Sequence, residues 1–214
     1  MNRTTFIVDG FNLYHSVCDA SRALGLAGTG VKWLNLRKSC ESYLALIGGP
    51  AQPERIYYFS ALATHLESAK PDLTLRHRTY LECLEDTGVV VELSRFKMKD
   101  IVCRQCGYKF QRAEEKETDV ALAVTLLEIL HRDECDTAVL ITGDTDIAPA
   151  VRTASALFPL KRVCFAFPFG RKNKELAKLV STSFRISKEA YASHQFADPV
   201  ILKSGKVISK PAKW

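Results

Sequence analysis

Residues 6–12 read FIVDGFN, and the rest of the chain can be interpreted outward from this stretch. A short apolar run ends at Asp9, which a glycine follows. Residues 138–146 repeat the arrangement far downstream, where the apolar run AVLI ends at TGDTD. In an open α/β sheet, residues just past the carboxyl ends of the strands line the crevice where ligands bind. The two stretches therefore predict acidic strand ends that meet at one edge of a sheet.

Carboxylates gathered at such an edge repel one another, and a hard divalent cation is the usual partner that holds them together. Asp9, Asp144 and Asp146 are the acids of the two stretches. Each also has a purely structural interpretation. Asp9-Gly10 is a common turn and Asn12 could cap the next helix, while Asp146 could itself be an N-cap. A third acidic segment, EEKETD at residues 114–119, immediately precedes an apolar helical pattern and strengthens the metal interpretation.

The composition is that of an ordinary globular domain, with 214 residues of which 47% are hydrophobic and 25% charged. The net charge is +6 although the predicted site is acidic, so positive charge must lie around that site, as suits a bound polyanion. The first strand begins directly after the initial residues, which leaves no room for a signal peptide, and no apolar stretch is long enough to cross a bilayer. Seven cysteines, an odd number, are typical of reduced thiols, so a cytoplasmic location without a membrane is predicted.

Strands and helices alternate along the chain. Strand-like runs rich in branched and aromatic residues occur at 4–8, 55–60, 89–96, 137–142 and 161–166. The alternation predicts a mainly parallel sheet covered by helices on both faces. The pattern at 120–130 is apolar nearly all round and predicts a deeply packed helix. From residue 195 the chain is rich in Lys, Ser and Pro, which predicts an extended or frayed C-terminal tail over 195–214.

Residues 95–113 break the alternation and are expected to form a small basic β-hairpin with its turn at Cys103 and Cys106. This CxxC pair resembles one half of a zinc ribbon, although structural zinc needs four ligands. The missing ligands could come from Cys83, Cys135, His77 or His131, or from the same pair of a second subunit; a turn without metal is the alternative. Cations and aromatic rings are interleaved here, as single-stranded nucleic acid prefers; a solvated hairpin with its rings in the core is the other interpretation. The side chains concerned are Arg95, Phe96, Lys97, Lys99, Arg104, Tyr108, Lys109, Phe110 and Arg112.

Three motifs in order, VDGFN at 8–12, KETDV at 116–120 and TGDTD at 142–146, resemble the NYN domain, specifically the LabA-like branch of the PIN-like nuclease superfamily. The resemblance spans roughly residues 4–187. It implies a PIN-like, Rossmann-like three-layer α/β fold with an acidic pocket at the strand ends. We expect one such domain over residues 1–194, with the hairpin at 95–113 inserted in it and the tail at 195–214 beyond it.

The resemblance also implies a metal-dependent ribonuclease. Carried over position by position, Asp9, Asp119, Asp144 and Asp146 would be the catalytic acids that hold Mg²⁺ or Mn²⁺. The substrate, expected to be single-stranded RNA, would also meet Asn12 and Thr142. Further basic residues, Arg171, Lys172 and Lys174, follow the fifth predicted strand, so we expect them on the rim of the acidic pocket, in contact with phosphates. A homodimer is compatible with these features.

Two other functions are compatible with parts of this sequence. A haloacid-dehalogenase-like phosphatase also has an aspartate at a strand end, but its chemistry needs a second acid two residues later, where this chain has Phe11. A non-catalytic RNA-binding or scaffolding module with a PIN-like fold is the alternative from a different class. The complete set of acids argues against it, because a lost nuclease would be expected to lose carboxylates first.

Overall fold

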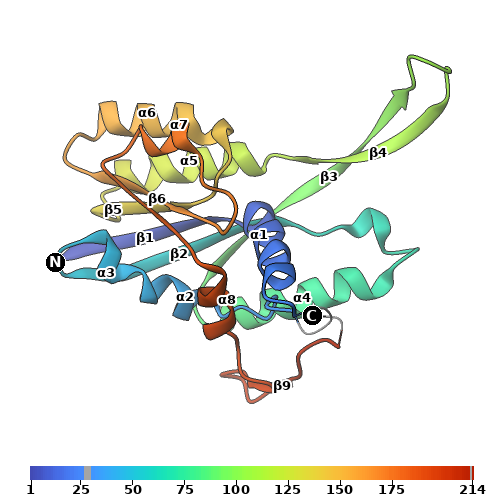
Figure 1. The fold of residues 1–214 in the computed structure, drawn as a ribbon, viewed down its shortest axis with the longest axis horizontal. Helices are drawn as coiled ribbons and strands as arrows, with labels where there is room; N and C mark the ends of the chain where they lie inside the picture. Colours follow the sequence, from blue (N-terminus) through green and yellow to red (C-terminus); the bar gives the residue numbers. More distant parts are fainter. Residues whose placement is uncertain (27–29, 213) are drawn as a thin grey trace.

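The computed structural model describes residues 1–26, 30–212 and 214, and its centre is a seven-stranded sheet (Figure 1). The strands lie in the order β4-β3-β2-β1-β5-β6-β7. All neighbours in this sheet pair parallel except β3 and β4, which pair antiparallel. The strands are β1 (Asn2–Asp9), β2 (Ala51–Ala61), β3 (Val90–Val102), β4 (Lys109–Lys116), β5 (Thr137–Ile141), β6 (Arg162–Phe167) and β7 (Thr182–Arg185). The predicted α/β, PIN-like architecture with a mainly parallel sheet is confirmed.

Helices cover both faces of the sheet, because successive side chains of a strand point to opposite faces. In β1, Phe6 and Val8 pack into one buried cluster while Ile7 packs into the other. One face carries α1 (Gly10–Ala23), α2 (Leu36–Ser42), α3 (Leu44–Ile47), α4 (Pro71–Asp86) and α8 (Lys188–Ser193); the opposite face carries α5 (Thr118–His131), α6 (Ala148–Leu157) and α7 (Lys174–Ala177) (Figure 1). Two 3₁₀ turns, η1 (Thr64–Leu66) and η2 (Thr145–Ile147), lie between these elements. No helix in the described ranges is long and apolar enough to cross a membrane.

Helix α5 is less buried than its sequence predicted. Leu122 and Leu126 are buried against the sheet, but Val120 and Val124 are 66% and 55% exposed. The prediction of a deeply packed helix is wrong because α5 lies in an outer layer beside α6, where a helix can bury only the stripe that faces the sheet and its neighbour. An apolar outer stripe therefore remains on this face of the molecule.

The basic hairpin is present and leaves the body of the molecule. Only residues 90–94 of β3 pair with β2, and residues 95–102 pair with β4 alone. The paired arm projects away from the helices, as Figure 1 shows. Tyr108 and Phe110 stack on each other at 6.2 Å between ring centroids and are 68% and 42% exposed. The interpretation that placed the hairpin aromatics in the core is therefore wrong for these two rings.

The described residues of the C-terminal segment, 195–212 and 214, are mostly extended and packed against the body. It contains a two-stranded hairpin, β8 (Val200–Ile201) with β9 (Val207–Ile208), and it buries Phe196, Leu202 and Ile208 in the same cluster as β1. The ring of Trp214 lies 5.1 Å from that of Tyr80 in α4. Of the two forms expected for this tail, extended or frayed, the described residues adopt the extended one, because their apolar side chains are buried in the core.

Candidate active site

The acids of the first and third motifs lie where the direction of strand connections reverses. Strand β1 is the neighbour of both β2 and β5; the chain continues from β1 to one side of the sheet and from β5 to the other. At such a switch point the connections part and leave a crevice beyond the carboxyl ends of the strands. Asp9 is the last residue of β1, and residues 142–146 directly follow β5. The site therefore lies where an open α/β sheet favours ligand binding.

Asp9 is a buried carboxylate that supports the surrounding backbone. Its side chain is 6% exposed and is the N-cap of α1, where Oδ1 accepts a hydrogen bond of 2.9 Å from the backbone N–H of Asn12. Oδ2 accepts a hydrogen bond of 2.8 Å from the hydroxyl of Thr142. Burial raises the pKa of Asp9, and the negative charges of Asp119 and Asp144 raise it further. The N-cap of α1 is therefore Asp9 and not Asn12, which the structural interpretation of the sequence had suggested.

Asn12 and Thr142 connect the two strand ends. The backbone N–H of Gly143 donates to Oδ1 of Asn12 at 3.1 Å, and that of Asp144 donates to Oγ1 of Thr142 at 3.1 Å. Thr142 is buried and Asn12 half-buried, so their polar atoms mainly serve the protein itself. Both were predicted to meet substrate; the structure places them beneath the carboxylates, where they fix the positions of Asp9 and of the loop after β5.

Two glycines allow this close packing. A Cβ atom at Gly10 would lie 2.4 Å from the backbone oxygen of Phe59, and one at Gly143 would lie 2.2 Å from that of Arg171. Neither obstacle is a flexible side chain, so any larger residue would push two backbone segments apart. The glycines of the DG and TGD motifs are thus explained by close approach of the chain.

Asp119 and a further acid, Glu115, reach the same edge through β4. Because Arg95 pairs with Lys116, β4 ends level with the point where β3 leaves the main sheet, and α5 begins there. The junction contains Glu117 in the left-handed conformation, with φ 82°, which is strained for a non-glycine residue. Partial burial raises the pKa of Asp119, and the charges of Asp144 and Asp146 add to this effect.

Glu115 was not predicted as a site residue. Burial has the largest effect on the pKa of Glu115 and raises it. A hydrogen bond from the Thr118 hydroxyl lowers this pKa, and the charges of Asp9 and Asp119 raise it further. Its place in the acidic segment 114–119 is the signal that the sequence contains. Glu115 lies in β4, close enough to Asp9 and Asp119 for their charges to affect its pKa. We call Asp9, Glu115, Asp119, Asp144 and Asp146 the acidic cluster.

The acidic cluster lacks a positive partner and has the right chemistry for a hard cation. Within residues 1–26, 30–212 and 214, none of its five carboxylates forms an ion pair. Asp144 and Asp146 are exposed, and Asp144 caps η2 through the backbone N–H of Asp146 at 3.1 Å. No three His, Cys, Asp or Glu side chains of the described residues converge tightly enough to form a closed metal site. Mg²⁺ is usually held by one or two carboxylates with several waters, so this open set of oxygen ligands fits it.

The sequence of the chain matches the NYN domain family over residues 4–187. The protein belongs to the NYN domain family. Proteins of this family are generally nuclease-like, with a PIN-like fold.

Two individual proteins resemble this NYN domain. The chain is 25% identical to 6-hydroxy-3-succinoylpyridine 3-monooxygenase HspA of Pseudomonas putida, in an alignment that covers 99% of this chain and 75% of the relative. It also resembles the crystal structure of VPA0982 from Vibrio parahaemolyticus, a protein of unknown function, with a TM-score of 0.56 and 16% identity, covering 87% of this chain and 93% of that one. The second likeness supports the fold alone.

The basic residues after β6 are not equivalent in this NYN domain. The guanidinium of Arg171 forms an ion pair of 2.7 Å with Asp19 of α1. Lys172 and Lys174 are exposed, and Lys174 begins α7, whose next residue, Glu175, lines one shallow groove together with Asp119 and Asp146. Lys172 and Lys174 therefore remain candidates for phosphate contact at the rim, whereas Arg171 is engaged by a carboxylate.

The cysteine turn has a geometry that favours a thiolate. The backbone N–H groups of Cys106 and Gln105 point at the sulfur of Cys103 and lower its pKa. Gly107 follows with φ 71° and donates its backbone N–H to the carbonyl of Cys103 at 2.9 Å. Completion of a zinc site by Cys83, Cys135, His77 or His131 is wrong, because no group of three such ligands exists among the described residues and both Cys83 and Cys135 are buried elsewhere. Ligands from a second subunit stay a prediction.

Proposed function

We propose that this NYN domain is a metal-dependent endoribonuclease that hydrolyses phosphodiester bonds of single-stranded RNA. The observation that carries the proposal is the acidic cluster at the switch point of the sheet, with a buried Asp9 and no cationic partner in the described chain. Mutual repulsion among five carboxylates at one edge destabilises the folded protein, and a bound cation would offset that repulsion. The order of the three motifs supports placing the protein in the LabA-like branch of the family.

The side chains divide the work according to their burial. Asp119, Asp144 and Asp146 lie at the surface and would hold Mg²⁺ or Mn²⁺ directly or through water. Asp9, fixed by two hydrogen bonds, would supply negative charge from below and set their spacing. A metal ion bound there would polarise a phosphoryl oxygen and lower the pKa of a bound water. The site needs no nucleophilic side chain, since water is the attacking group.

The basic hairpin gives the RNA strand a second surface on which to lie. Lys97, Lys99 and Arg112 lie on its exposed arm, and Tyr108 with Phe110 provides two stacked, solvent-facing rings. Exposed rings among cations are the usual platform for single-stranded nucleic acid. Lys172 and Lys174 would contact phosphates at the opposite rim. The RNA would thus cross the acidic cluster between two positive surfaces.

A non-catalytic RNA-binding module remains the second candidate, and one observation favours it. The described carboxylates do not form a closed three-ligand site, so a metal would have to draw the side chains together or bind through water.

The name of the Pseudomonas relative refers to oxygenation of a hydroxypyridine, and at 25% identity it does not support transfer of that activity. All seven cysteines are free, which favours a reducing compartment such as the cytoplasm.

A circular single-stranded RNA tests both candidates, because only an endonuclease can open it. We expect the purified protein to linearise the circle with Mn²⁺ or Mg²⁺ and not with EDTA. The Asp144→Asn variant should lose cleavage while keeping its fold and its binding of RNA. Glu128→Gln is the matched control, because Glu128 is an exposed acid at the far end of α5 whose ion-pair partner among the described residues is Arg132. Binding without cleavage by the wild type would favour the non-catalytic module.

A further inference from the structure

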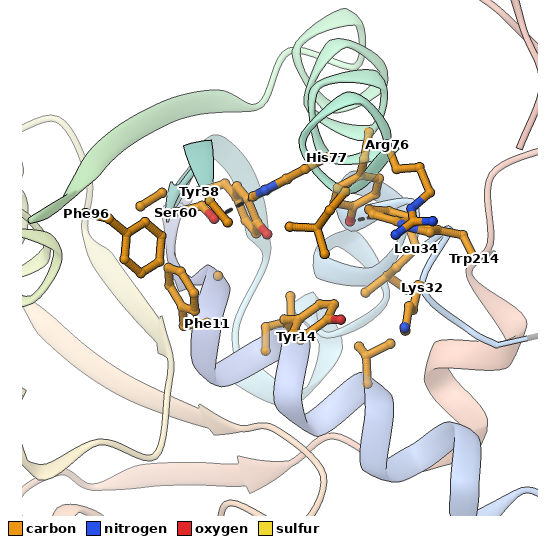
Figure 2. A pocket seen from close by; sticks show the side chains of 17 residues that line it. Phe11, Tyr14, Lys32, Leu34, Tyr58, Ser60, Arg76, His77, Phe96 and Trp214 are labelled. Carbon is orange, nitrogen blue, oxygen red and sulfur yellow. Dashed lines mark hydrogen bonds between the residues drawn. The ribbon is translucent and has the colours of Figure 1, made fainter. Parts of the chain in front are cut away.

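A cavity of about 200 Å³ lies beside the acidic cluster on the α1 face of the sheet. It is enclosed by the start of α1, the end of β2, the first turns of α4 and the base of the hairpin, as Figure 2 shows. Pockets for drug-sized ligands measure about 300–1,000 Å³, so this one suits a single flat ring system. The ribonuclease mechanism proposed above does not use it.

The walls of the cavity are largely aromatic. Tyr14 of α1, Tyr58 of β2, Phe96 of β3 and the C-terminal Trp214 line the space, and Phe11 lies beside Phe96 with the rings edge to face at 5.9 Å. Phe11 and Phe96 are half-buried, so neither side chain is fully covered by the hydrophobic core. Exposed ring faces around a narrow space are what a stacked base requires.

Cations and polar groups stand at one side of the same space. The ammonium of Lys32 lies 5.3 Å from the ring centre of Tyr14, and Arg76 contributes its side chain from α4. The Nε of Arg76 is buried and finds no hydrogen-bond partner in the described part of the chain. Ser60 and His77 contact each other at 3.4 Å on the inner wall. Burial lowers the pKa of His77 to about 4, so this imidazole is neutral at pH 7 and can read a polar ring edge without adding charge.

The cavity and the acidic cluster share a wall. Gly10 and Phe11, which line the cavity, directly follow Asp9 in the chain. Phe96, on the hairpin side, pairs in register with Glu115 of the acidic cluster. A strand whose phosphate lies over the carboxylates would therefore have an adjacent base within reach of the aromatic walls.

We propose that this cavity is the base-binding subsite of the ribonuclease, which takes one unpaired base flanking the cleaved phosphate, with Lys32 and Arg76 near the next phosphate of the strand. The inference rests on the proposed function for its substrate class, and it assigns the cavity a role in positioning the strand. The subsite binds the base through stacking between Tyr14, Tyr58 and Phe96, and the inner wall formed by Ser60 and His77 faces its edge. A free nucleotide would offer the same ring, but it would not need the neighbouring carboxylates.

The test uses a short single-stranded RNA and a series of derivatives in which one position at a time carries an abasic ribose. Binding is measured by fluorescence anisotropy with EDTA, so that cleavage cannot interfere. We expect one position in the series to weaken binding by wild-type protein about five- to hundredfold, the range for loss of one base–aromatic stack. Cleavage with Mn²⁺ should occur next to that position.

Variants locate the effect. Ala63→Phe should fill the cavity, since Ala63 lines it, and should bind intact and abasic RNA equally well; Ala156→Phe, on the exposed surface of α6, is the control. If Ala63→Phe does not fold, Lys32→Gln serves instead, with exposed Lys38→Gln as its control, and should weaken binding of intact RNA.

The outcomes separate this proposal from the ribonuclease itself. Equal binding of intact RNA and every abasic derivative by the wild type would overturn the subsite, even if the protein cleaves RNA. Loss of binding at one abasic position would support the subsite, even if no cleavage is found and the ribonuclease proposal fails. A nucleoside monophosphate that raises the melting temperature of the wild type but not of Ala63→Phe, while abasic RNA binds normally, would assign the cavity to a free nucleotide and overturn the proposal.

Discussion

Replacing Asp9 tests two roles of the central carboxylate: that of a hydrogen-bond acceptor that stabilises the fold, and that of a buried charge that destabilises it when no metal is bound. Asp9→Ala removes the acceptors of two hydrogen bonds, from the backbone N–H of Asn12 and from the hydroxyl of Thr142, in a side chain that is 6% exposed. Asp9→Asn keeps an acceptor for the N–H and removes the negative charge. Both variants should abolish cleavage, but their stabilities should differ.

The magnitude follows from the two donors that alanine leaves without a partner. Each unsatisfied buried donor costs about 1–3 kcal/mol. We therefore expect the free energy of unfolding of Asp9→Ala to be about 3 kcal/mol lower than that of Asp9→Asn. For a chain of this size, 1 kcal/mol shifts the melting temperature by about 2–4 °C, which predicts a difference of about 6–12 °C between the two variants. Each unit by which the pKa of Asp9 is raised costs the ionised form about 1.4 kcal/mol, so Asp9→Asn should be more stable than the wild type without metal.

The assay is thermal unfolding by circular dichroism in EDTA over a series of pH values. Because the folded protein binds the Asp9 proton more tightly than the unfolded chain does, wild-type stability should fall as pH rises from 3.8, the ordinary pKa, through the raised value. The advantage of Asp9→Asn over the wild type should therefore be largest at neutral pH and shrink toward pH 4. Adding Mn²⁺ should stabilise the wild type more than Asp9→Asn, since binding to the folded state alone raises its stability and the variant has one negative charge fewer to attract the ion.

Two results would refute this reasoning. Equal melting temperatures for the alanine and asparagine variants would mean that the two hydrogen bonds contribute nothing measurable. An Asp9→Asn variant that melts below the wild type at neutral pH in EDTA would show that the charge is already balanced, and that the acidic cluster is a structural ion network and not a metal site.

Three further predictions concern other parts of the chain. Gly143→Ala should lower the melting temperature by about 2–12 °C, since its Cβ would lie 2.2 Å from a backbone oxygen and overpacking costs about 1–3 kcal/mol; unchanged melting would contradict the close approach. Neutralising Lys172 and Lys174 to glutamine should weaken RNA binding about equally for all sequences and reduce the salt slope by about 0.7 per lysine, and an unchanged slope would place the phosphate path elsewhere. Elemental analysis should find one zinc per chain or per dimer, lost in Cys103→Ser or Cys106→Ser; absence of zinc with both thiols freely alkylated would leave a turn without metal.

The sequence alone determined the layout of the site. Apolar runs that end at Asp9 and before Asp144 are local signals, because strand alternation and the residue at a strand end are properties of a few neighbours. The hairpin with its cysteine turn was also visible locally, as a basic interruption of the alternating pattern. Since parallel strands bring their carboxyl ends to one edge, this much placed the first and third motifs together without any coordinates.

Only the tertiary structure decided which side chains touch. Thr142 donates to Asp9 across 133 residues of sequence, and Glu115 joins the acidic cluster because the register of β3 with β4 places it there. The burial of Phe196 and the cavity beside Tyr58 likewise depend on how separate elements pack. A linear pattern shows the periodicity of one element at a time, whereas these contacts depend on the relative positions of several elements, which long-range packing alone fixes.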